Sequence, residues 1–468
     1  MTDNYFNSKR FKRILNQYEE SEKTGTPVFL DSDEFTDIAE YYQGKGETAR
    51  ACDVVDYALS IYPDATAPLV FKARMALFKQ DNVRLAEQIA ESISDKTDLE
   101  YIYIMAEIMI ADNRVEEADE YLNEKYNDID DAEREDFVLD VVTLFCDYEL
   151  SEQADAWLQR AEETDTLDYK ELMGRILMGK GRYTESERLF NELLDQDPYS
   201  NHYWNCLASS QLLNNHIQDA ITSSEYSIAI NPDDDEAVLN KANALFNLGN
   251  YEDALEYYKR FTALRPDEDT GEMYQGITLL SVNRLEEAVE HLTKAEQMSD
   301  GKSPNHAEIC QELAFTLSRL HRMDEALAYI DKTDTNMCDA NELMVLRGHV
   351  MLENGYYEQA QLCFSTAVKD SGASPHVYLR IAISVYDNGY IRLAYKMFNI
   401  LFKAVDEHWN EGFSYMALCC KDLGKQDEYK KWLQKACTTN PAEARTVVGE
   451  LFPPEMPPEE YYLNAELN

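Results

Sequence analysis

The chain has 468 residues, 44% of them hydrophobic, and its 89 Asp and Glu residues outnumber its 43 Lys and Arg residues, giving a formal charge of −46. This length exceeds one ordinary compact core, so several domains or a repeat array are expected. A surface this acidic repels phosphate backbones and anionic lipid headgroups, which argues against nucleic-acid binding and against an anionic membrane. We therefore expect a protein or peptide partner that is basic or neutral.

The cysteines and the start of the chain bear on the compartment. Nine cysteines are scattered along the sequence without a CxxC pair, which is typical of a protein in a reducing environment. The first residues, MTDNYFNSKR, lack the apolar segment of a secretory signal, and no run of about 18 apolar residues follows. We expect a cytoplasmic protein without membrane insertion.

The first predicted element is a basic amphipathic helix over residues 7–23, NSKRFKRILNQYEESEK. Its apolar stripe consists of Phe11, Ile14, Leu15 and Tyr18, as in a helix that covers the open end of a repeat array. The alternative is a docking arm, because four Lys and Arg residues cluster near its start. An extended link follows, with Asp31 or Ser32 as the expected N-cap of the next helix. Residues 1–31 thus form a predicted N-terminal cap and linker.

From residue 32 onward a short motif recurs. It reads GKGETARA at 44–51, GKGRYTES at 179–186, NLGNYEDA at 247–254, ENGYYEQA at 353–360 and DNGYIRLA at 387–394. When the last residue of the motif is taken as a marker, twelve copies follow one another at spacings of 32 to 38 residues, clustered on 34. The markers are Ala51, Ala86, Ala118, Ala154, Ser186, Ala220, Ala254, Ala288, Ala326, Ala360, Ala394 and Tyr429. Such a period predicts a repeat architecture.

Two further positions keep the same register. A small residue lies twelve positions before most markers, with Arg74 and Val142 as exceptions, and a large apolar or aromatic residue often lies four positions after the marker. Each unit therefore reads as two amphipathic helices that cross at the small residue. A small side chain there lets the backbones approach, so that the neighbouring large residues interlock.

The turn between the two helices has its own composition. Five positions before the marker, ten of the twelve residues are Gly, Asn or Asp. These residues tolerate the positive φ that the residue after a helix commonly adopts. The first copy, GKGETA, also resembles a phosphate-binding loop, but a dinucleotide-binding glycine loop follows a strand, whereas this one follows a predicted helix. We interpret the glycines as helix stops rather than as a nucleotide site.

This pattern resembles the tetratricopeptide repeat, whose period is 34 residues. The resemblance is clearest in residues 204–232 and 238–266, and about twelve units span residues 32–441. It implies an all-α fold, an α-solenoid that winds as a right-handed superhelix of helix-turn-helix units with capping helices. The longer spacing around residues 296–306 marks a possible bend. Residues 442–468 are predicted to form a capping helix and then an acidic, Pro-rich, mobile tail that contains the PxxP string at 454–457.

No catalytic signature is visible. The sequence lacks HExxH, GxSxG, P-loop and kinase motifs, and its eight His residues form no cluster with cysteine. The repeats also occupy nearly the whole chain, which leaves no stretch for a catalytic domain. We predict no enzymatic activity, no cofactor and no metal.

The resemblance implies a surface instead. In the tetratricopeptide family the first helices line a concave groove that receives extended or helical peptides. Carrying the groove positions onto this chain gives the candidates Asn205, Ser209, Leu239, Asn243, Phe246, Met273 and Ile277. For the apolar members, the alternative is packing against the adjacent unit.

The leading hypothesis is a non-enzymatic scaffold that binds a peptide or protein partner in the groove. The alternatives are a structural or assembly protein that self-associates through the array, and an accessory subunit of an enzyme complex. The sequence predicts no particular oligomeric state.

Overall fold

The computed structural model describes residues 5–6, 8–78, 82–299, 301, 303–333, 338–453 and 456–465. Within these residues the regular structure is helical and no strand is present, which confirms the all-α prediction. The first long helix, α2 (Lys9–Thr24), buries Phe11, Ile14 and Tyr18 in a cluster with residues of the following helix pair. None of the described helices is long and apolar enough to cross a membrane.

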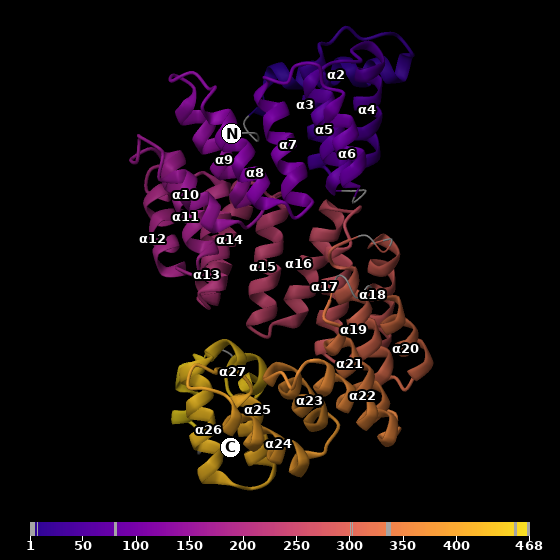
Figure 1. The fold of residues 1–468 in the computed structure, drawn as a ribbon, viewed down its shortest axis with the longest axis vertical. Helices are drawn as coiled ribbons and strands as arrows, with labels where there is room; N and C mark the ends of the chain where they lie inside the picture. Colours follow the sequence, from indigo (N-terminus) through magenta and orange to yellow (C-terminus); the bar gives the residue numbers. More distant parts are fainter. Residues whose placement is uncertain are drawn as a thin grey trace. The chain divides into compact units, whose positions relative to one another are not determined.

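Twelve consecutive helix pairs follow in the described part of the chain, as the period predicts (Figure 1). They are α3 (Ser32–Gly44) with α4 (Thr48–Ile61), α5 (Thr66–Phe78) with α6 (Val83–Glu91), α7 (Leu99–Ala111) with α8 (Val115–Tyr126), α9 (Arg134–Asp147) with α10 (Ser151–Leu158), α11 (Leu167–Gly179) with α12 (Tyr183–Leu194), α13 (Asn201–Leu213) with α14 (Ile217–Ile230), α15 (Asp235–Asn247) with α16 (Tyr251–Leu264), α17 (Thr270–Ser281) with α18 (Leu285–Ser299), α19 (His306–Arg319) with α20 (Met323–Lys332), α21 (Ala340–Glu353) with α22 (Tyr357–Asp370), α23 (Pro375–Asp387) with α24 (Ile391–Ala404), and α25 (Phe413–Asp422) with α26 (Gln426–Thr439).

The first pair begins at the predicted N-cap. The side chain of Asp31 accepts a hydrogen bond from the backbone N–H of Glu34 at 2.8 Å, and the Glu34 carboxylate accepts one from the backbone N–H of Asp31 at 3.2 Å. This reciprocal capping box satisfies two backbone donors that the helix itself leaves unpaired. It therefore fixes the residue at which the repeat array starts.

The turn inside each pair has the predicted left-handed residue. Every described residue five positions before a marker has a positive φ, including the two that are not Gly, Asn or Asp, Glu149 and His321. The set is Gly46, Asn113, Glu149, Gly181, Asn215, Gly249, Asn283, His321, Gly355, Gly389 and Gly424; Asp81 lies outside the described residues. The backbone conformation is thus the same at all eleven described positions, even where the residue type differs.

The helices cross at the predicted small residues. A Cβ placed on Gly174 would lie 2.8 Å from the ring of Phe190, and one on Gly276 would lie 2.5 Å from the Leu292 side chain. Each contact joins the small residue twelve before a marker to the large residue four after it. Close approach of the two backbones is therefore what excludes a side chain at these positions.

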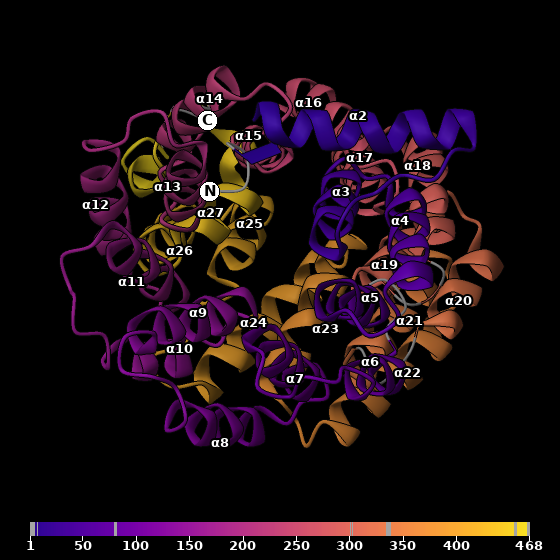
Figure 2. The same ribbon diagram turned by 90° about the horizontal axis from the view of Figure 1, so that it is seen from above.

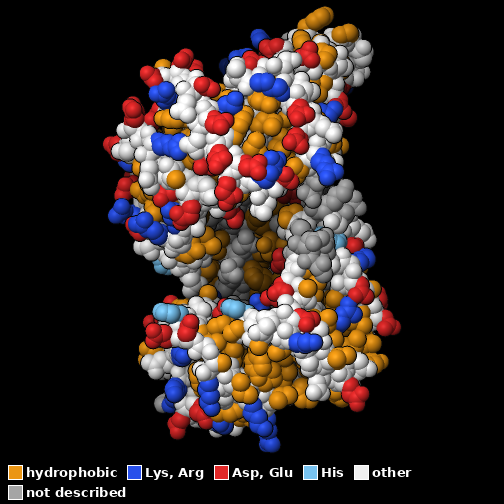
Figure 3. Space-filling model, in the orientation of Figure 1, with side chains coloured by type: hydrophobic (Ala, Val, Ile, Leu, Met, Phe, Trp, Pro, Cys, Tyr) orange, Lys and Arg blue, Asp and Glu red, His pale blue; other side chains and the backbone are white. Residues whose placement is uncertain are grey.

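The chain divides into two compact units. The first comprises Met1–Asn240 and Ala263–Glu268, and the second comprises Lys241–Thr262 and Asp269–Asn468. In each unit the core is continuous from one pair to the next. In the second unit, one cluster joins Met273, Leu292, Leu313 and Val350, which belong to three successive pairs. Helices α18 and α19, which flank the longer spacing, both belong to the second unit, and the bend proposed around residues 296–306 stays a prediction. Asp and Glu side chains are spread over the visible face of each unit (Figure 3).

The C-terminal tail differs from the sequence-based expectation. After α27 (Pro441–Val448) and the 3₁₀ helix η1 (Gly449–Leu451), residues Pro458–Leu463 form a second 3₁₀ helix, η2. Tyr461 is buried and stacks on Phe452 with 4.3 Å between ring centroids. The described part of the tail thus packs on the last pair because its aromatic residues cover the apolar end of the array. Pro454 and Glu455 of the PxxP string lie outside the described residues.

Candidate functional site

The first helix of each pair lines the inner side of the first unit. Viewed from above, α3, α5, α7, α9, α11 and α13 lie on the inside of the curve, and α4, α6, α8, α10, α12 and α14 lie outside them (Figure 2). Residues on the inward faces of these first helices are therefore the ones available to a partner that lies along the curve.

A pocket of about 740 Å³ lies between three of these inner helices, α3, α5 and α7. Its lining residues are Ser32, Asp33, Thr36, Asp37, Glu40, Gln43, Thr66, Ala67, Val70, Phe71, Arg74, Phe78, Asp98 and Glu100. Five of these residues are carboxylates. The pocket was not predicted from the sequence, because none of its residues belongs to the candidate groove set.

The carboxylates reach the pocket through the helical period. Asp33, Asp37 and Glu40 are spaced at i, i+4 and i+7 on α3, which places them on one face of that helix. The other face of α3 carries the buried residues Phe35 and Ile38, which pack into the core. The core therefore fixes the rotation of α3 that turns its acidic stripe toward the pocket.

Apolar side chains form the remainder of the wall. Val70 and Phe71 are buried in α5, whereas Phe78 at the end of α5 leaves 58% of its surface exposed. An aromatic ring exposed beside carboxylates suits a ligand that carries both a positive charge and a hydrocarbon stem. The side chains of lysine and arginine have this composition.

Arg74 is the one cation among the lining residues, and it is already paired. Its Nη2 lies 2.7 Å from an oxygen of the buried Glu107, and its Nε donates to the same carboxylate at 3.0 Å. Burial alone would lower the pKa of Arg74. The hydrogen bonds and the charge of Glu107 outweigh burial, so the pKa of Arg74 is raised. Arg74 Nη2 also lies 3.8 Å from Glu100, so this one cation is shared between Glu107 and the five pocket carboxylates, and the pocket keeps a net negative charge.

Three of the pocket carboxylates, Asp37, Glu40 and Glu100, have raised pKa values. Burial raises the pKa of Glu40, and the neighbouring charge of Asp37 raises it further, against the opposing effect of Arg74. Burial likewise raises the pKa of Glu100 and of Asp37, and the latter also accepts a hydrogen bond from the hydroxyl of Tyr5. A raised pKa means that the ionised carboxylates lack sufficient positive partners within the protein. A bound cation would supply that partner.

The predicted groove residues of the first unit lie on α13 and α15. Asn205 is only 3% exposed and donates to Asp234 at 3.1 Å, while its Oδ1 is buried without a hydrogen-bond partner. Ser209 accepts a hydrogen bond from Nδ2 of Asn240 at 3.1 Å. Leu239 is half-buried. Polar contacts therefore link the inner helices here, and Ser209 and Leu239 keep some accessible surface.

The remaining predicted residues lie in the second unit. Asn243 accepts a hydrogen bond from the Tyr258 hydroxyl at 2.8 Å, and Phe246 is half-buried with its ring edge against another aromatic residue. Ile277 is partly buried against the core. Met273 is 1% exposed and packs with core residues, so packing against the adjacent unit accounts for it, and we do not carry it into a contact surface.

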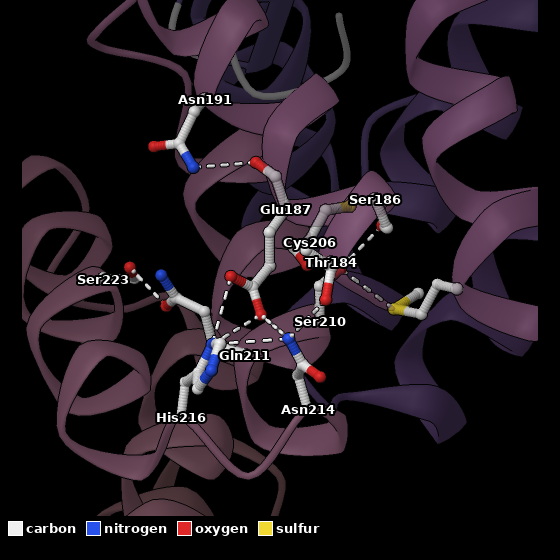
Figure 4. Close-up of polar contacts among 11 residues, drawn as sticks. Thr184, Ser186, Glu187, Asn191, Cys206, Ser210, Gln211, Asn214, His216 and Ser223 are labelled. Atoms are coloured by element: carbon white, nitrogen blue, oxygen red, sulfur yellow. Dashed lines mark hydrogen bonds and ion pairs between the residues drawn. The ribbon is translucent and has the colours of Figure 1, made fainter. Parts of the chain in front are cut away.

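Buried hydroxyl and amide groups fix how α12, α13 and α14 pack (Figure 4). Ser186, which replaces alanine at a marker position, donates to the carbonyl of Gly174 and lies 2.8 Å from the Ser210 hydroxyl. Ser223 donates to the Gln211 side chain at 2.7 Å. Closer to the surface, Glu187 accepts from Asn214 at 2.7 Å and faces the ring of His216. These contacts join neighbouring helices and serve packing.

Within the described residues, no group of three or more His, Cys, Asp or Glu side chains is arranged to hold a metal ion. The lining of the pocket combines carboxylates with the apolar side chains of Val70, Phe71 and Phe78, an arrangement suited to recognition through charge and apolar contact.

Comparisons with known proteins found a family model and several solved structures that are similar to this chain. The model of the family described as the tetratricopeptide repeat matches residues 172–236 and 239–306. The crystal structure of yeast Tom70 aligns with 100% of this chain and 94% of its own, at 13% identity and a TM-score of 0.43. The crystal structure of the APC/C hetero-tetramer Cut9-Hcn1 matches over 92% of this chain and 95% of the matched chain, at 13% identity and a TM-score of 0.42. PilF of Pseudomonas aeruginosa aligns over 46% of this chain and 94% of its own length, at 16% identity and a TM-score of 0.39. No curated protein sequence matches the chain.

Proposed function

We propose that the chain is a non-enzymatic scaffold for a protein partner, because the tetratricopeptide-repeat model matches residues 172–236 and 239–306 and the same helix pair repeats on both sides of that segment. The proposed binding surface is the inner face of the first helices, in a cytoplasmic setting. Proteins built from such repeats bind protein partners, and this chain's charge of −46 favours a basic or neutral one.

One observation carries the choice of surface, the acidic pocket between α3, α5 and α7. A partner peptide that places a lysine or arginine there would neutralise carboxylates whose ionised form is disfavoured by burial. The hydrocarbon stem of the same side chain, or an apolar neighbour in the peptide, would cover Phe78. The pocket therefore favours a peptide with a basic residue beside an apolar one.

Further along the array, the proposed contacts are Ser209, Leu239, Asn243, Phe246 and Ile277. These residues combine hydrogen-bonding groups with half-buried apolar side chains, the mixture that holds a peptide backbone and its anchoring side chains. They remain a weaker part of the proposal, because Asn243 is already engaged by Tyr258. We rank the pocket first.

The test is fluorescence anisotropy with a labelled extended peptide that alternates Lys or Arg with Leu or Phe. A peptide with Glu in place of the basic residues serves as the control ligand. The double variant Glu40→Gln/Glu100→Gln should weaken binding of the basic peptide about tenfold, equivalent to about 1.4 kcal/mol, since it removes two of the carboxylates facing the ligand. The double variant Glu116→Gln/Glu120→Gln, on exposed positions of the outer helix α8, makes the same change of net charge outside the pocket.

The controls separate the pocket from the general charge of the chain. If both double variants weaken binding equally, net charge and not the pocket is responsible, and the proposed site is wrong. Wild-type affinity should fall with added salt. It should also fall as the pH is lowered, because Asp37, Glu40 and Glu100, whose pKa values burial raises, take up protons at a higher pH than ordinary carboxylates. Phe246→Ala in the same assay tests the second part of the surface.

A further inference from the structure

The outer face of α24 differs from the rest of this acidic protein. Its exposed residues include three cations, Arg392, Lys396 and Lys403, and the helix contains no carboxylate. Residues 375–440 contain nine Lys and Arg residues and seven Asp and Glu residues, so this segment carries a small positive charge in a chain whose overall charge is −46. The three cations of α24 have no ion pair among the residues that the structure describes.

Two large aliphatic side chains lie among these cations. Leu393 is 51% exposed and Ile400 is 59% exposed. They are seven residues apart, so they share one face of the helix and are about 10 Å apart along its axis. A different face of α24 buries Ala394, Phe398 and Leu401 in the core. The helix is therefore apolar on its outer face in addition to the face that the fold requires.

A ring contact joins the start of α22 to this surface. Tyr357, the first residue of α22, is 60% exposed and contacts Tyr390, the residue that precedes α24, with 6.3 Å between ring centroids. We name these residues the α22–α24 strip; it comprises Tyr357, Tyr390, Arg392, Leu393, Lys396, Ile400 and Lys403. In the space-filling view, hydrophobic side chains gather on the visible face of the second unit with Lys and Arg side chains around them (Figure 3).

We propose that the α22–α24 strip is a second interaction surface, which binds an acidic amphipathic helix of a partner protein. Leu393 and Ile400 would receive two apolar side chains one or two turns apart on that helix, and the three cations would face its carboxylates. Other occupants fit less well. A second copy of this chain and an anionic membrane are both repelled by its net charge of −46 at long range, whereas a short helix presents much less charge to the rest of the molecule.

This inference goes beyond the proposed function, because the strip lies on second helices and favours the opposite charge. A scaffold with both surfaces would bind a basic partner on its inner face and an acidic one on its outer face. The two surfaces share no residue, so each is tested without altering the other.

The experiment measures anisotropy of a labelled synthetic peptide with Leu at helical i, i+3 and i+7 spacing and Glu at the other positions, added to the full chain. The control ligands are the same peptide with Lys in place of Glu and a scrambled peptide of the same composition. Two variants test the strip, Leu393→Ser/Ile400→Ser and Lys396→Gln/Lys403→Gln. A matched control, Lys259→Gln/Lys294→Gln, removes two exposed lysines from the outer helices α16 and α18.

We expect the acidic peptide to bind at least about tenfold more tightly than either control peptide, and both strip variants to lose about tenfold, with the matched control unchanged. Because the substituted side chains are exposed, circular dichroism should report an unaltered fold for every variant. Equal binding of the three peptides, or strip variants that retain wild-type affinity, would overturn the proposal. So would sedimentation showing a dimer that Leu393→Ser/Ile400→Ser dissociates, or strip-dependent binding to phosphatidylserine vesicles without preference among the peptides.

Discussion

The left-handed turn at Glu149 offers a direct test of the reasoning from the repeat. Glu149 has φ 58° and lies just after the first helix of its pair, at a position that glycine fills in six other units. Its backbone N–H donates to the Cys146 carbonyl at 3.1 Å, and the next N–H donates to the Phe145 carbonyl at 2.9 Å. The equivalent bonds at Gly181 are 3.0 and 2.8 Å. The turn is therefore the same, and only the residue type differs.

The expected effect of Glu149→Gly follows from these numbers. A residue with a Cβ costs about 1–2 kcal/mol in the left-handed region, and glycine avoids this cost. Glycine also gains about 0.5–1 kcal/mol of entropy in the unfolded chain, which offsets part of the benefit. No hydrogen bond or ion pair of the exposed Glu149 side chain is lost within the described residues. The free energy of unfolding should rise by about 1 kcal/mol, which corresponds to about 2–4 °C in Tm for a unit of this size.

The assay is urea denaturation followed by circular dichroism, with hydrogen exchange of the α9 and α10 amides to locate the effect. Glu149→Gln and Glu149→Ala are the controls, because both remove the charge and keep the Cβ. If either control stabilises the chain as much as Glu149→Gly does, relief of like-charge repulsion and not backbone conformation explains the gain, and the argument from φ is refuted.

Two further predictions concern the crossing of the helices and a buried carboxyl. Gly348→Ala should lower the free energy of unfolding by about 1–3 kcal/mol, because a Cβ at this position meets the Phe364 ring. Gly44→Ala is the control and should not lower it, because no atom lies within 4 Å of a Cβ at Gly44. Equal effects of the two variants in urea denaturation would contradict the packing argument. Burial raises the pKa of Glu312 to about 7, so the folded state binds the proton more tightly and stability should rise as the pH falls from 8 toward 5.5. Glu312→Gln should remove that rise in Tm against pH, and a variant that keeps it would show that another group is responsible.

The repeat register was predictable from sequence because the same steric demand recurs in every pair. Wherever two helices cross closely, one position must be small and its partner large, as at Gly174 and Phe190. The turn likewise demands positive φ, and the composition at that position reveals it even though Glu149 and His321 depart from the preferred residues. These features depend on contacts within one pair, so local spacing contains the necessary information.

The tail shows where composition misled. Its prolines and glutamates predicted a mobile segment, yet Tyr461 is buried against Phe452 and the segment covers the end of the array. The last pair of any repeat array has an apolar face with no successor, and something must cover it. The sequence signal for the packed tail is the pair of aromatic residues Phe452 and Tyr461, which the polar composition of the segment as a whole obscures.

The pocket could not be predicted in the same way, because it forms from positions that do not repeat. Carboxylates on α3 and α7 face one space only through the angle between successive pairs, which no single unit encodes. One signal was present: Arg74 occupies a position where the register expects a small residue. Four residues separate α5 from α6, where three separate α3 from α4, so the small residue of this pair is the buried Ala73 and Arg74 turns away from the crossing to bind Glu107. The departure from the register at Arg74 thus marks a position that does not pack at the helix crossing, and Arg74 lines the acidic pocket.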